Sequence, residues 1–160
     1  MENKYFDFHE IKTFEDACKR LGLPEESLIV ESYGFAPAYD AANAFYKLLV
    51  IQKVINNGVL IHEDSRFLYT PFFSFYSEKT VKGMSDVEKR KICIDRYIPC
   101  IDVYTKRKVY ALIMYPIPFD SDEFTNSFIP FRFNSDEAAL YAVRQFKDLF
   151  LKYYGYEILK

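Results

Sequence analysis

Basic side chains alternate with aromatic ones in two stretches of the sequence, at residues 104–110 (YTKRKVY) and 131–133 (FRF). In a single-strand binder, cations contact phosphates and aromatic rings stack on bases. The residues that would bind in this way are Tyr104, Lys106, Arg107, Lys108, Tyr110, Phe131, Arg132 and Phe133. A solvated hairpin turn and an amphipathic strand give the same pattern. In that interpretation Tyr104 and Tyr110 form a cross-strand aromatic pair that stabilises the hairpin.

Motifs for catalysis or for metal binding do not occur in the sequence. It contains no Gly-rich nucleotide loop, no nucleophile elbow and no HExxH motif. His62, Glu63 and Asp64 are metal-binding types, but three adjacent residues cannot all point at one ion on regular structure. The acidic stretch 120–126 lacks the glycine and the distal glutamate of a calcium loop. We therefore expect a non-enzymatic protein with no metal and no cofactor.

Length and charge restrict the class of protein further. The 160 residues suit one domain, 1–160, and a net charge of -2 excludes a wholly basic surface for duplex nucleic acid. No run approaches the roughly 18 apolar residues of a membrane span, and the N-terminus lacks the features of a signal peptide. Cys18, Cys93 and Cys100 are an odd number without metal-type spacing. We therefore expect buried, unbridged thiols, a cytoplasmic location and no membrane partner.

The aromatic content is high, with 14 Tyr and 16 Phe but no Trp. Two interpretations are open. These rings can form a Phe- and Tyr-rich core, which is the commoner use of aromatic residues. Alternatively, they can form an exposed platform for bases, sugars or peptides.

Three segments have apolar residues at helical spacing, and a glycine follows each of them. The predicted helices cover 13–21, 37–57 and 135–154, and the glycines are Gly22, Gly58 and Gly155. For the last helix, Asn134 and Ser135 are both suitable N-caps, and Asn134 has the spacing of a capping box with Glu137. Ser85 and Glu88 have the same spacing and indicate a short surface helix.

Strand patterns fill the middle of the chain. We expect an edge or bulged strand at 66–77, because it contains Pro71, and a strand at 92–104 with a bulge beside Pro99. A hairpin turn at 105–108 leads into a central strand at 109–115, and the last strand covers 128–133. The sequence thus predicts a single α+β domain. It consists of a mainly antiparallel sheet of about four strands with two long helices packed on one face, plus a short N-terminal helix.

Several of these segments also resemble a known group of sequences. They are Ile11–Cys18 (IKTFEDAC), Tyr46–Leu49, Ile55–Gly58, the aromatic stretch Tyr69–Phe75 and Ser135–Phe150. In this order they resemble uncharacterised phage- or mobile-element-associated proteins of gut anaerobic bacteria. The resemblance covers both ends and the second helix, and it implies a small intracellular accessory protein. We therefore expect a binding or protein-interaction module, with single-stranded nucleic-acid binding as the alternative.

Overall fold

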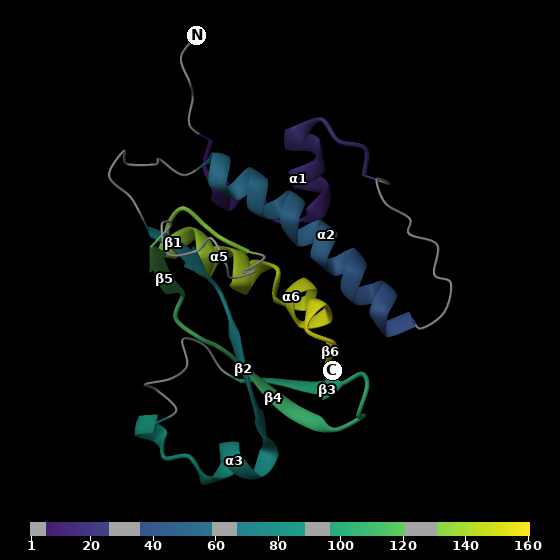
Figure 1. Ribbon diagram of the computed structural model, residues 1–160, viewed down its shortest axis with the longest axis vertical. Helices are drawn as coiled ribbons and strands as arrows, with labels where there is room; N and C mark the ends of the chain where they lie inside the picture. The colour runs from purple at the N-terminus through teal and green to yellow at the C-terminus, as the bar shows by residue number, and fades with distance from the viewer. Residues whose placement is uncertain (1–5, 26–35, 59–66, 89–96, 121–130) are drawn as a thin grey trace.

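The computed structural model describes residues 6–25, 36–58, 67–88, 97–120 and 131–160. Within these residues two antiparallel sheets lie beside a group of helices, and the predicted α+β class is confirmed (Figure 1). The four-stranded sheet has the order β2 (Phe73–Ser77), β4 (Lys108–Ile113), β3 (Ile98–Asp102) and β6 (Tyr156–Ile158). The smaller sheet pairs β1 (Phe67–Thr70) with β5 (Ile117–Asp120).

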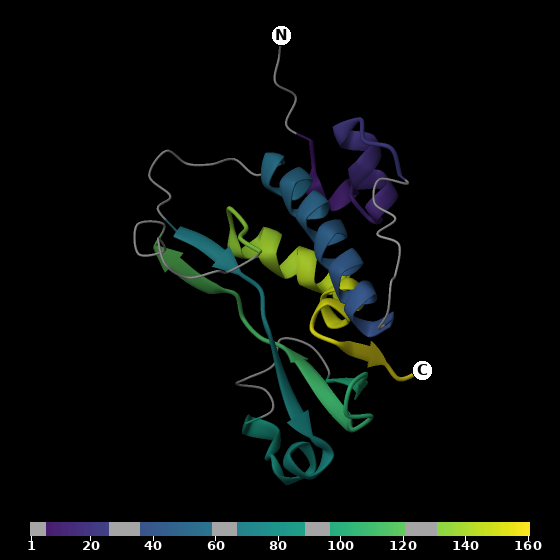
Figure 2. The same cartoon turned by 45° about the vertical axis from the view of Figure 1, so that its right-hand side comes forward.

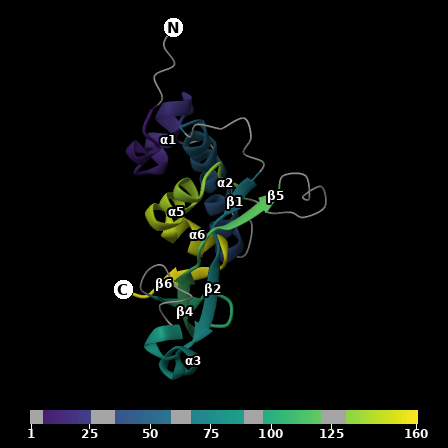
Figure 3. The ribbon, with the colours of Figure 1, turned by 90° about the vertical axis from the view of Figure 1, so that its left-hand side faces the viewer.

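The helices lie mainly on one side of the strands. They are η1 (Phe8–Glu10), α1 (Phe14–Leu21), α2 (Ala36–Asn57), α3 (Glu78–Gly83), α5 (Asp136–Gln145) and α6 (Lys147–Tyr153). α6 contacts β6 and α5 contacts β1, whereas α2 packs mainly on α1, α5 and α6. The view in Figure 3 shows α1 and α2 at one end of the molecule and α3 at the other, with the four-stranded sheet between them. The second long helix therefore lies farther from the sheet than predicted.

The N-terminal helix begins and ends where the sequence predicts. Thr13 Oγ1 accepts a hydrogen bond from Asp16 N, and the Asp16 carboxylate accepts one from Thr13 N, so the two residues form a capping box. Gly22 ends the helix with a left-handed φ of 66°. Local interactions alone fix both ends of α1.

The C-terminal helix differs from the prediction in two respects. Ser135 is its N-cap, because Ser135 Oγ accepts a hydrogen bond from Ala138 N; the capping box of Asn134 with Glu137 is wrong. The helix is also divided into α5 and α6 at Phe146, whose φ of -112° and ψ of 26° leave the helical range. Phe146 O accepts hydrogen bonds from the backbone N–H groups of Leu149 and Phe150, so the chain continues directly into α6.

The strand at 66–77 is interrupted at Pro71, and a long two-stranded ribbon results. β2 pairs with β4, β1 pairs with β5, and a hydrogen bond from Met114 N to Phe72 O joins the two parts (Figure 2). Two residues (71–72) separate β1 from β2, but three (114–116) separate β4 from β5. The extra residue forms a bulge beside Pro116, because a proline has no backbone N–H that could donate to the neighbouring strand.

Other strand predictions need correction. Residues 98–101 pair with β4 in an unbroken register, so the bulge at Pro99 is wrong, and Lys108 belongs to β4 rather than to the turn. In place of a last strand, Phe133 forms an isolated bridge with Tyr69; residues 128–130 lie outside the described part. α3, β5 and β6 were not predicted. The expected capping box is present, since Ser85 Oγ accepts from Glu88 N and Glu88 Oε2 accepts from Ser85 N.

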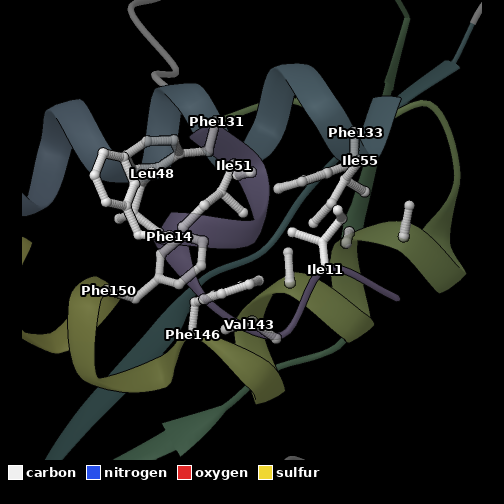
Figure 4. Packing of buried hydrophobic residues seen from close by; sticks show 14 of the residues in the cluster. Ile11, Phe14, Leu48, Ile51, Ile55, Phe131, Phe133, Val143, Phe146 and Phe150 are labelled. Atoms are coloured by element: carbon white, nitrogen blue, oxygen red, sulfur yellow. The ribbon is translucent and has the colours of Figure 1, made fainter. Parts of the chain in front are cut away.

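The core is largely aromatic. Figure 4 shows Phe131, Phe133 and Phe150 packed with Leu48 and Ile51 between α2 and the C-terminal helices. Ring contacts then continue into the sheet through Phe45, Phe131, Phe150, Phe73, Phe75 and Tyr156. Among the Phe and Tyr residues whose side chains the structure describes, Tyr104, Tyr115 and Tyr154 are exposed and the others are buried or half-buried.

Candidate binding surface

The β3–β4 hairpin has a well-defined turn. Asp102 Oδ1 accepts hydrogen bonds from the backbone N–H groups of Tyr104 and Thr105, both at 2.8 Å. Lys106 N donates to Asp102 O at 2.9 Å, and Lys106 has a left-handed φ of 59°. The backbone hydrogen bonds from Thr105 and Tyr104 lower the pKa of Asp102, so this carboxylate remains charged and holds the turn.

The three cations of the hairpin are exposed. Lys106 and Arg107 lie in the turn, and Lys108 begins β4. Lys108 Nζ lies 5.5 Å from the centroid of the Tyr110 ring, which is within the range of a cation–π contact. The positive charge predicted for this turn is therefore on the surface.

The two hairpin tyrosines lie in different environments. Tyr110 is opposite Tyr76 of β2 and Pro99 of β3, and its ring meets the Tyr97 ring edge to face at 6.0 Å. Tyr104 is 54% exposed and lies in the turn, against Gly155. The predicted cross-strand pair of Tyr104 with Tyr110 is therefore wrong.

The second basic-aromatic stretch belongs to the core rather than to the surface. Phe131 is 2% exposed and Phe133 is 1% exposed. The intervening carbonyl of Arg132 accepts hydrogen bonds from the Gln52 and Asn56 side chains, at 2.8 and 2.9 Å. Because their rings are buried, Phe131 and Phe133 cannot stack on bases. The prediction that they belong to the binding surface is therefore wrong.

A second group of aromatic residues lies beside the hairpin, and we call it the Gly155 surface: Phe75, Tyr104, Tyr154 and Tyr156. A Cβ atom on Gly155 would lie 2.6 Å from Tyr104 Cε2, so the glycine permits the close approach of this ring. Phe75 contacts Tyr154 at 6.0 Å and Tyr156 at 4.0 Å between ring centroids. The sequence prediction missed this surface because β6 was not predicted. Figure 2 shows β6 beside the hairpin.

Burial changes the chemistry of the Gly155 surface. Although 37% of Tyr154 is exposed, burial around its hydroxyl raises its pKa. Burial likewise raises the pKa of Tyr156. Both tyrosines therefore stay neutral at physiological pH.

A depression of about 440 Å³ lies between η1 and α5, and we call it the His9 depression. It is lined by His9, Asp136, Glu137, Leu140, Tyr141, Arg144 and Gln145. The Tyr141 hydroxyl donates to His9 O and to Ile11 O, at 3.1 and 2.8 Å, and Gln145 Nε2 donates to Lys12 O. Periodicity assigned Tyr141 and Gln145 to a helix, but nothing in the sequence indicated that they hold the N-terminal segment.

The described residues contain no group of three or more His, Cys, Asp or Glu that could hold a metal ion. His62, Glu63, Asp64 and Cys93 lie outside them. Cys18 and Cys100 are buried free thiols, and burial raises the pKa of Cys100 to about 11.

No described helix combines the length and the apolar character that crossing a bilayer requires. Comparison of the chain with protein-family models, curated proteins and solved structures gives no match.

Proposed function

We propose that this chain is a small, non-enzymatic binding module that recognises an acidic segment of a protein partner. The observation that carries this proposal is the exposed hairpin turn, in which Tyr104 lies against Gly155 and the exposed cations Lys106 and Arg107 follow it. Tyrosine and arginine are enriched in protein interfaces and at their energetic hot spots. We expect an accessory protein of the reducing cytoplasm, as the resemblance to phage-associated proteins and the buried free thiols suggest.

The local charge favours an acidic partner. The whole chain has a net charge of -2, but the hairpin has three cations in sequence, Lys106 to Lys108. The nearest acidic residue in the hairpin, Asp102, has its carboxylate directed at the backbone N–H groups of the turn. An acidic segment would therefore meet the exposed cations Lys106 and Arg107, with the Tyr104 ring beside them for its apolar side chains.

Single-stranded nucleic acid is the second candidate, because Tyr104 and the same cations suit phosphates and bases. It ranks second because few ring faces are open to stacking. Phe75 and Tyr156 stack on each other at 4.0 Å, and one side of Tyr104 lies against Gly155. With Phe131 and Phe133 buried, Tyr104 is the one exposed ring among the residues predicted for base stacking.

Fluorescence anisotropy can compare the two candidates directly. The probes are a labelled peptide rich in Asp and Glu with one Tyr and one Leu, and a labelled oligo-dT, both at low salt. We expect the peptide to bind, and the double variant Tyr104→Ala, Arg107→Glu to lose this binding. The matched control, Tyr115→Ala with Lys53→Glu, changes an exposed tyrosine and an exposed lysine elsewhere and should bind normally.

Two outcomes would count against the proposal. If only oligo-dT binds, with salt-sensitive affinity that Arg107→Glu weakens, the second candidate replaces it. If neither probe binds at tens of micromolar protein, the hairpin is a solvated turn without this role.

A further inference from the structure

One face of α5 carries opposite charges at its two ends. Glu137, Leu140, Tyr141 and Arg144 follow the helical spacing i, i+3, i+4 and i+7, and all of them line the His9 depression. Glu137 and Arg144 are seven residues apart, which is about 10 Å along a helix that rises roughly 1.5 Å per residue. The face therefore runs from an acidic end to a basic end, and between them Lys12 Nζ lies 5.3 Å from the centroid of the Tyr141 ring.

The acidic end is rich in hydrogen-bond acceptors. Asp7 Oδ1 lies 2.7 Å from His9 Nδ1, and a carboxylate only accepts, so Nδ1 carries the proton of this contact. His9 Nε2 lies 3.8 Å from Glu137 Oε1. Asp136 adds a second carboxylate to the same lining. A donor-rich, positively charged group is the natural ligand for this end.

The other parts of the depression define the rest of the ligand. Leu140 and the Tyr141 ring line the middle and suit an aliphatic chain. The Arg144 guanidinium lines the far end and suits a carboxylate. The N-terminal segment at the edge of the depression accepts hydrogen bonds from the Tyr141 hydroxyl and from Gln145 Nε2 of α5, so this edge is ordered before a ligand binds.

We infer that the His9 depression binds a small zwitterion whose ammonium and carboxylate are separated by an aliphatic chain. The ammonium lies at Glu137 and Asp136, the chain lies over Leu140 and Tyr141, and the carboxylate lies at Arg144. The volume of about 440 Å³ is in the usual range for a small-molecule site. This site is separate from the hairpin, and neither proposal depends on the other.

Titration followed by two-dimensional NMR tests the inference with ε-aminocaproate as the probe. We expect saturable shifts at millimolar concentrations, concentrated on the amides of His9, Glu137 and Arg144. Caproate lacks the ammonium and hexylammonium lacks the carboxylate, so each should bind about threefold or more weakly, as expected when one exposed ion pair is lost. A peptide that ends in lysine with a free carboxylate offers both the ammonium and the carboxylate. The same peptide with an amidated C-terminus lacks the carboxylate. Tighter binding of the free acid than of ε-aminocaproate would identify a protein terminus as the source.

Variants separate the two ends of the site. Glu137→Gln should weaken the binding of ε-aminocaproate about threefold or more and leave the binding of caproate unchanged. Arg144→Gln should also weaken the binding of ε-aminocaproate about threefold or more, but it should leave the binding of hexylammonium unchanged. Glu10→Gln and Lys152→Gln are control variants outside the lining, and thermal unfolding of every variant checks the fold. The inference is overturned if no saturable shift occurs, if hexylammonium or caproate binds as tightly as the zwitterion, or if the controls lose as much affinity as the lining variants.

Discussion

Replacing Gly155 by alanine tests the packing of the candidate surface. Gly155 has a φ of +80°, and a Cβ atom there would lie 2.6 Å from Tyr104 Cε2. The substitution therefore adds left-handed backbone strain and displaces an aromatic ring. Gly22 is the matched control, because its φ is +66° and a Cβ atom there would meet nothing within 4 Å. Gly22→Ala measures the strain without the displacement.

The magnitudes can be worked out for each position. A left-handed conformation costs an L-residue about 1–2 kcal/mol. Alanine also lowers the conformational entropy of the unfolded chain, which offsets about 0.4–1 kcal/mol of this cost. Gly22→Ala should therefore lower the free energy of unfolding by about 1 kcal/mol. Steric overpacking adds about 1–3 kcal/mol in a core. Tyr104 is 54% exposed and can move, so the lower value applies. Gly155→Ala should therefore destabilise by about 2 kcal/mol.

Urea unfolding of a double-mutant cycle separates the two terms. Gly155→Ala is measured in the native sequence and in the Tyr104→Ala background. We expect a coupling of about 1 kcal/mol, so that without the ring Gly155→Ala costs as little as Gly22→Ala. Equal costs in both backgrounds would show that Tyr104 does not lie on Gly155, and the Gly155 surface would then have to be abandoned.

Three further predictions concern the core, a thiol and the turn. Phe146→Ala should destabilise by about 3–5 kcal/mol, because Phe146 is 5% exposed where α5 meets α6; a loss under about 1 kcal/mol in thermal unfolding would contradict its burial. Because burial raises the pKa of Cys100 to about 11, its thiol should alkylate slowly in native protein at mildly alkaline pH and rapidly in urea; rapid native labelling, detected by mass spectrometry, would show an exposed thiol. The hydrogen bonds from Thr105 and Tyr104 lower the folded pKa of Asp102. Asp102→Asn should therefore lower stability above the unfolded pKa of about 3.9, and the difference should vanish as the pH falls through the folded pKa. Urea unfolding across this range would refute the linkage if the difference were independent of pH.

The helix ends that local interactions determine could be read from the sequence. The capping box of Thr13 with Asp16 and the left-handed Gly22 and Gly155 involve residues at most a few positions apart. By contrast, the role of Asn134 depends on Asn56, which lies 78 residues away: Asn134 N donates to Asn56 Oδ1, and Asn134 Nδ2 donates to Asn56 O. A residue that satisfies a distant backbone carbonyl has the same local pattern as an N-cap.

The same limit applies to the candidate site. Phe131 and Phe133 are separated by one basic residue, and this alternation occurs both on a strand with exposed rings and on a segment whose rings are buried. The burial depends on α2, which donates hydrogen bonds from Gln52 and Asn56 to the carbonyl of Arg132. The contact of Tyr104 with Gly155 is equally non-local, since it joins a hairpin turn to the start of β6. The exposure of Lys106 and Arg107 was predictable because it depends only on the turn, whereas Lys108 begins β4.

The Gly155 surface is continuous with the core, and this determines how its function must be tested. Phe75 and Tyr156 come from β2 and β6, the opposite edges of the four-stranded sheet, yet their rings stack at 4.0 Å. The intervening strands have small, fully buried residues, Ala111 on β4 and Cys100 on β3, which leave room for the rings above them. Removing Phe75 or Tyr156 would therefore lower stability together with any binding. Tyr104 is 54% exposed, so its removal should lower stability less than removal of Phe75 or Tyr156 and is the better test of binding.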